Sequence, residues 1–80
     1  MAVITVDQAK LDAREATNVR RERDKRMKSF EWRLQRHARE VRLGQTPTDN
    51  IADLDAYMQA LADITEQPGF PDDITWPTEP

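Results

Sequence analysis

Few side chains in this 80-residue chain are of the kinds that carry out catalysis or bind metal ions. The chain has one histidine, His37, one serine, Ser29, and no cysteine. A catalytic site needs a nucleophile held beside an acid or base, and a metal site needs several ligands gathered together. No glycine-rich phosphate-binding loop occurs either. The sequence therefore predicts a protein that is not an enzyme, with no catalytic, metal-binding or cofactor-binding residues.

Charge is divided sharply between the two halves of the chain. All 12 Lys and Arg lie in residues 1–44 with seven acids, whereas residues 45–80 have eight acids and no base, so that the total is −3. We expect the two halves to attract each other, within one chain or between copies. The basic run at residues 20–26 raises nucleic-acid binding as an alternative, because phosphates are bound by clustered Arg and Lys. Interleaved acids and the acidic total argue against it.

Two helices are expected to position these groups. No glycine or proline occurs before Gly44, and Thr5 and Gln8 have the spacing of a capping box, so the first helix is predicted over about residues 6–43. Its seam follows alternating steps of four and three residues: Ala9, Ala13, Ala16, Arg20, Arg23, Met27, Phe30, Leu34, His37 and Val41. A turn at 44–49 precedes a second helix at about 50–65, for which Thr48, Asp49 and Asn50 are candidate caps.

The predicted architecture is a single all-α domain over residues 1–80. A short turn between helices favours an antiparallel hairpin, in which the shorter second helix covers only the second half of the first. The first half, with Ala9, Ala13 and Ala16, would then lack a partner within the chain, so we expect self-association through helix one, in the manner of a coiled coil. No apolar run approaches the length of a bilayer span, and we expect a soluble intracellular protein without membrane contact.

The last segment, residues 66–80, is predicted to be an extended, proline-rich arm, because proline fixes φ and lacks a backbone donor. The arm carries Phe70, Ile74 and Trp76, large apolar side chains that a purely solvated segment would not need. Either the chain's own helices or a partner should cover them. We identify Phe70, Ile74 and Trp76 as candidate partner-binding residues, with Tyr57 and Leu61 supporting them from the second helix.

Over residues 19–80 the chain resembles the small tail assembly chaperones of tailed bacteriophages. The motifs that carry the resemblance are the following: Arg20, Arg23 and Asp24; Trp32; Arg36, His37 and Glu40; Gly44 and Thr46; Tyr57, Gln59, Ala60, Leu61, Asp63 and Ile64; and Gly69, Phe70, Pro71, Ile74, Trp76 and Pro77. The C-terminal motif is also similar to that of related tail-fibre assembly proteins. The chain departs from relatives at Met58 and Ala62, where they usually carry arginine, and at Glu79, near which they often carry a basic residue.

The resemblance implies a non-enzymatic protein of a bacteriophage or prophage that binds tail proteins transiently in the cytoplasm of the bacterial host. Its partners would be tape-measure, tail-tube or fibre subunits. Two alternatives stay open at this point: a structural adaptor or connector that remains in the virion, and a nucleic-acid-binding regulator that uses the basic run. The expected homo-oligomer through helix one comes from the alanine half of that helix, which lacks a partner in the predicted hairpin, and not from the resemblance.

Overall fold

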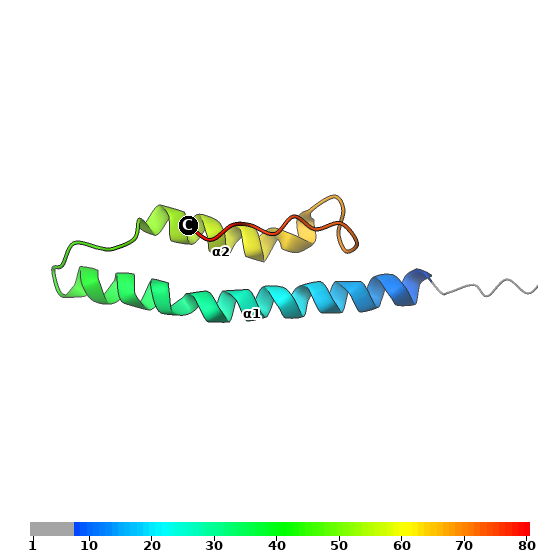
Figure 1. The fold of residues 1–80 in the computed structure, drawn as a ribbon, viewed down its shortest axis with the longest axis horizontal. Coiled ribbons are helices and arrows are strands. Elements are labelled where there is room, and N and C mark those ends of the chain that lie inside the picture. Colours follow the sequence, from blue (N-terminus) through cyan, green and yellow to red (C-terminus); the bar gives the residue numbers. More distant parts are fainter. Residues whose placement is uncertain (1–7) are drawn as a thin grey trace, which may run out of the picture.

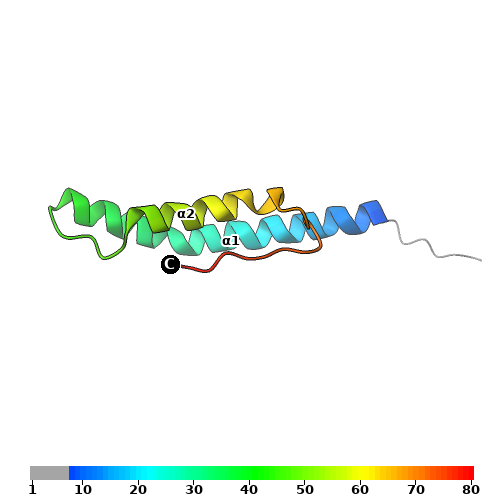
Figure 2. The same cartoon turned by 90° about the horizontal axis from the view of Figure 1, so that it is seen from above.

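The computed structural model describes residues 8–80, which form two α-helices and one short 3-10 helix. They are α1 (Gln8–Arg42), α2 (Ile51–Ala62) and η1 (Asp63–Glu66). In Figures 1 and 2, α2 lies beside α1 and runs in the opposite direction. Residues 8–80 contain no strand, so the predicted all-α fold class is confirmed. The expected helix start near residue 6, with its Thr5 cap, lies outside the described residues.

Local sequence signals set the helix ends on either side of the turn. Gly44 adopts φ +70°, a conformation that glycine reaches without strain, while the Gln45 N–H donates to the Glu40 carbonyl (2.8 Å) and the Gly44 N–H to the Val41 carbonyl (3.1 Å). These two bonds form a Schellman motif that ends α1. Of the three cap candidates, Asn50 begins α2, since its side chain accepts from the Ala52 N–H at 2.8 Å.

The core lies where α1 and α2 face each other. Phe30 from α1 packs against Leu54, Tyr57 and Leu61 from α2, and each of these four side chains is 4% exposed or less. The Phe30 and Tyr57 rings lie 4.5 Å apart between centroids at an interplanar angle of 55°, a favourable tilted arrangement. Four half-buried side chains pack around this cluster: Met27, Leu34, Met58 and Trp76.

The covered part of α1 differs from the predicted seam. Ala16 and Val19 are 9% and 8% exposed, so the expectation that the first half of α1 lacks cover within the chain is wrong at Ala16, although Ala9 and Ala13 are exposed. Besides α2, η1 also contacts α1. Val41, by contrast, was placed on the seam but is 56% exposed.

The turn explains why Val41 is exposed. Asp49 pairs with Arg33 and Arg36, so the chain returns to α1 well before its last turn. α2 begins just after this contact, at Ile51. The whole of α2 is thereby displaced toward the N-terminal side of α1, and Val41 is left in solvent.

Candidate interaction surface

The sequence left open whether the chain's own helices or a partner cover the apolar side chains of the arm. In the structure, the arm folds back on the chain's own helices. It runs beside α1 in the same direction as α1 (Figure 2). The Arg20 guanidinium carbon lies 5.5 Å from the centroid of the Phe70 ring, and that of Arg26 lies 4.3 Å from the centroid of the Trp76 ring. Two cation–π contacts therefore hold the arm in register with successive turns of α1.

A tight turn directs the arm onto this path. The Phe70 N–H donates to the Gln67 carbonyl (3.0 Å) and the Asp73 N–H to the Gly69 carbonyl (2.7 Å). The Gln67 side chain then closes the turn, since its Nε2 donates to the Thr75 carbonyl at 2.7 Å and its Oε1 accepts from the Thr75 N–H at 2.8 Å. The Phe70–Pro71 peptide bond within the turn is cis. One glutamine thus satisfies backbone groups of an extended segment that has no strand partner.

Ionic contacts fix the other end of the arm and the turn before α2. Asp49 accepts from Arg33 Nη2 at 2.8 Å and from Arg36 Nη2 at 2.6 Å, and these two bonds lower the pKa of Asp49 to about 2. Arg33 Nη1 also donates to the Pro80 carbonyl at 2.7 Å. Glu40 accepts from the Thr48 hydroxyl at 2.7 Å and its N–H at 3.1 Å, and both bonds lower the pKa of Glu40. Charge-assisted bonds therefore tie both segments to α1.

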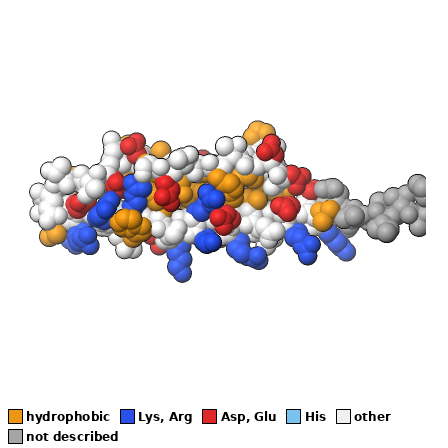
Figure 3. Space-filling model, in the orientation of Figure 1, with side chains coloured by type: hydrophobic (Ala, Val, Ile, Leu, Met, Phe, Trp, Pro, Cys, Tyr) orange, Lys and Arg blue, Asp and Glu red, His pale blue; other side chains and the backbone are white. Residues whose placement is uncertain are grey.

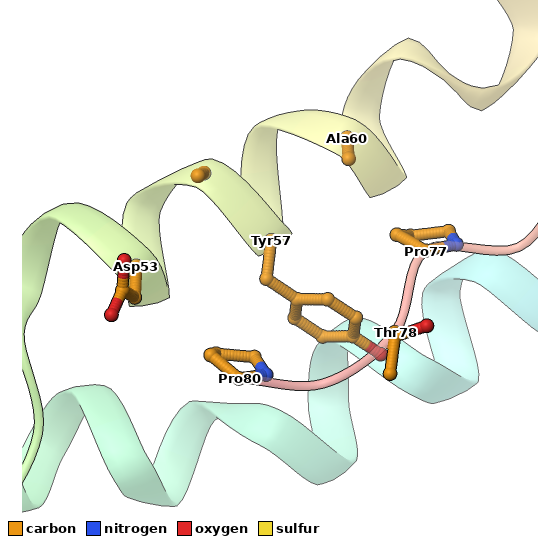
Figure 4. Close-up of a pocket in the computed structure, with 7 residues that line it drawn as sticks. Asp53, Tyr57, Ala60, Pro77, Thr78 and Pro80 are labelled. Atoms are coloured by element: carbon orange, nitrogen blue, oxygen red, sulfur yellow. The ribbon is translucent and has the colours of Figure 1, made fainter.

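Between α2 and the arm lies an open groove of about 250 Å³. Its lining, which defines the α2–arm groove, consists of Asp53, Ala56, Tyr57, Ala60, Pro77, Thr78 and Pro80. Figure 4 shows the Tyr57 ring extending from α2 toward the arm, between Pro80 and Thr78, with Asp53 at one end. The two alanines leave the space open, because a methyl group is all that either one adds to the helix surface.

The predicted partner-binding residues occupy two environments. Tyr57 and Leu61 are 4% and 0% exposed and belong to the core, where Trp76 packs against the same cluster. Phe70 and Ile74 are half-buried in the arm, as is Trp76. The structure thus brings Tyr57, Leu61 and Trp76 together. Contact with a partner by any of the five residues stays a prediction.

Sequence reasoning missed the residues that dock the arm. Arg20 lies on the predicted seam, where arginine counts as an interruption of the apolar stripe. Its position on the seam was the available indication that it contacts an aromatic side chain. Arg26 and Gln67 offered no such signal, because their partners lie far along the chain or on an irregular segment. Ala56 and Ala60 could have been identified from their spacing of four residues on α2, which places both on one face.

The described residues show no arrangement suited to a metal ion or to a membrane span. Within residues 8–80, no three His, Cys, Asp or Glu side chains lie close enough together to ligate a metal ion. None of the helices described there combines the length and apolar character that a bilayer crossing needs.

Comparison with known proteins yields one match. The family model for phage tail assembly chaperone proteins matches residues 16–80, which include most of α1, the whole of α2 and the arm. Neither the curated proteins nor the solved structures give a match. The matched region contains every residue of the core, of the arm contacts and of the α2–arm groove. On the strength of this match over most of its length, the chain belongs to the phage tail assembly chaperone family.

Proposed function

We propose that this protein is a non-enzymatic tail assembly chaperone that binds tail components transiently through α2 and the arm. Its clients would be tape-measure, tail-tube or fibre subunits in the cytoplasm of the bacterial host. Family membership supports the role in tail assembly. The α2–arm groove is the observation that supports this location for the contact, since it is formed jointly by the two predicted binding elements.

The dimensions of the groove favour a protein client over a small molecule. Its volume of about 250 Å³ is below the range of roughly 300–1,000 Å³ that is usual for small-molecule sites. Space of this size accepts one or two side chains of a client segment. Ala56 and Ala60 form its α2 wall, the Tyr57 ring offers an apolar surface, and the exposed Asp53 carboxylate can pair with a client cation.

The arm supplies the larger apolar part of the proposed contact. Phe70, Ile74 and Trp76 are half-buried, so each keeps part of its surface available while the arm remains docked. Tyr57 and Leu61 would support this surface from below rather than contact the client broadly, because their side chains are almost fully covered. A contact of this kind is small and rimmed by polar groups, which suits a transient complex.

A substitution that fills the groove tests the proposal. Ala56 is exposed and lines the groove, whereas Ala62 is exposed on the same helix but does not line it. Ala56→Trp should weaken capture of co-expressed tail proteins by about tenfold, which corresponds to roughly 1.4 kcal/mol. Ala62→Trp is the matched control and should bind like the parent. Equal binding by the two variants would refute the proposed location.

The chaperone role has a separate test. A chaperone leaves the assembled tail, so mass spectrometry of purified particles should detect no stoichiometric amount of this protein. A fixed copy number in the particle would instead favour the structural adaptor or connector. Tail yield in phage that lack the gene should fall, and an unchanged yield would contradict a role in assembly.

A further inference from the structure

The outer surface of α1 carries a continuous basic stripe. Its members follow one another at steps of three, four or seven residues, so they share one side of the helix. They are Lys10, Arg14, Arg21, Lys25, Lys28, Arg39 and Arg42, with Trp32 among them. All eight side chains are exposed, and Trp32 retains 56% of its surface. In Figure 3, Lys and Arg side chains project along the edge that α1 forms.

Few acids interrupt this side of the helix. Asp24, between Arg21 and Lys28, and Glu31, three residues after Lys28, lie at its edge. Asp24 pairs with Arg23 at 3.0 Å, and Glu22, on another side, pairs with Arg26 at 3.1 Å. None of the seven bases of the stripe forms an ion pair with another described residue. On this side of α1, seven bases therefore stand against two acids, Asp24 and Glu31.

An acidic surface lies on the other elements of the same chain. Residues 43–80 contain eight acids and no Lys or Arg, and only Asp49 among these acids pairs with a base. The other seven are exposed. Asp53 lines the α2–arm groove, and Asp72, Asp73 and Glu79 belong to the arm. Asp55, Asp63 and Glu66, along α2 and η1, constitute the acidic surface. The molecule thus presents a basic stripe on α1 and an acidic surface on α2 and η1.

We propose that a second copy of this chain docks its acidic surface on the basic stripe of α1. Charge complementarity selects this occupant, because the chain itself supplies an exposed anionic surface. A polyanion such as nucleic acid would meet the same stripe, and the oligonucleotide experiment below distinguishes it from a second copy. This inference is independent of client binding, and it replaces the alanine contact that the sequence suggested for helix one.

The arrangement of the two surfaces determines the kind of assembly. They belong to different elements of the molecule, so a copy that offers its acidic surface to one neighbour keeps its basic stripe for another. Such head-to-tail contact is heterologous and continues into a ring or a stack rather than stopping at a symmetric dimer. Because the contact is exposed and ionic, salt should weaken it strongly.

Sedimentation velocity of the whole chain over a range of salt tests the proposal. At an ionic strength of about 0.03 M and micromolar protein, the weight-average mass should be at least twice the 9.3 kDa of one chain. At about 1 M, where the Debye length is about 3 Å, the association constant should fall at least tenfold. A single chain at every ionic strength would overturn the proposal.

Charge reversal identifies the two surfaces. Lys25→Glu/Lys28→Glu alters the stripe and Asp55→Lys/Asp63→Lys alters the acidic surface. Each variant alone should lose association, and a mixture of the two should regain it, because each retains the surface that the other needs. Glu15→Lys is the control: Glu15 is exposed on α1 away from the stripe, so this change raises the net charge without altering either surface. Circular dichroism checks that all three fold.

Two results would refute this assignment. If the mixture failed to associate while each variant folded, complementarity between copies would be wrong. If the parent bound a fluorescent single-stranded oligonucleotide through Lys25 and Lys28 while remaining monomeric, the stripe would belong to a nucleic-acid partner instead.

Discussion

Two aromatic residues two positions apart on α1 should differ widely in what they contribute to stability. Phe30 is 1% exposed, with the Tyr57 ring on one side and the Arg33 guanidinium carbon 5.0 Å from its centroid. Trp32 is 56% exposed, and the Arg36 guanidinium carbon lies 4.9 Å from its ring centroid. Truncation of the smaller ring should therefore have the larger effect.

The magnitudes follow from burial. Phe30→Ala removes a fully buried ring and should lower the free energy of unfolding by about 3–5 kcal/mol. A chain of this length is stable by roughly 4–12 kcal/mol at typical values per residue, so the variant should approach the point of unfolding. Trp32→Ala should change stability by about 0.5 kcal/mol or less, as usual for a surface site.

Urea and thermal unfolding followed by circular dichroism measure these values. Each kcal/mol corresponds to a shift in Tm of about 4–8 °C in a domain of this size, so the two variants should differ by more than about 10 °C. Phe30→Leu keeps most of the volume and should lose less than about 1.5 kcal/mol, which leaves a measurable value if Phe30→Ala does not fold. Equal losses for Phe30→Ala and Trp32→Ala would refute the placement of the core.

Three further predictions concern the turn before α2 and the arm. The pKa of Asp49 is lowered from 3.8 to about 2, so its contribution to stability is complete above pH 3.8 and is lost as the pH falls toward 2. In acid unfolding experiments, the free energy of unfolding of Asp49→Asn should therefore decrease less steeply with falling pH than that of the parent. Asn50→Ala removes the α2 cap and should cost about 1 kcal/mol, with Asn50→Ser close to the parent in urea unfolding. Gly69→Ala should loosen the arm, since the new methyl group would overlap the Asp73 carbonyl oxygen, and limited proteolysis near residue 70 should accelerate relative to the exposed control Ala62→Gly.

The sequence was most informative where a structural feature depends on neighbouring residues. Gly44 ends α1 through a local left-handed conformation, and Asn50 begins α2 with a bond to a residue two positions away. Both signals act within one turn of helix, so no knowledge of the fold is needed to recognise them. The pattern of Leu54 and Leu61 likewise indicated the buried side of α2, because both sit on one helical face.

The path of the arm could not be predicted in the same way. Arg33 and Pro80 bond across 47 positions, and no periodicity connects them. Hydrophobic patterning also treats arginine as a break in an apolar stripe, yet Arg20 and Arg26 are the residues that hold Phe70 and Trp76. Val19 is buried but is not part of the predicted seam, because a strict alternation of steps of four and three residues passes from Ala16 to Arg20.

The contacts of Arg33 have a consequence for the order in which the chain acquires its structure during translation. This guanidinium contacts the Phe30 ring, Asp49 and Pro80. These three residues are far apart in the sequence, so they leave the ribosome at different times. The helical pair can close once α2 has emerged, but the arm finds its anchor only after Pro80 follows. A nascent chain therefore passes through a stage in which the hairpin is formed while the side of Trp76 that will meet Arg26 is still open to other proteins.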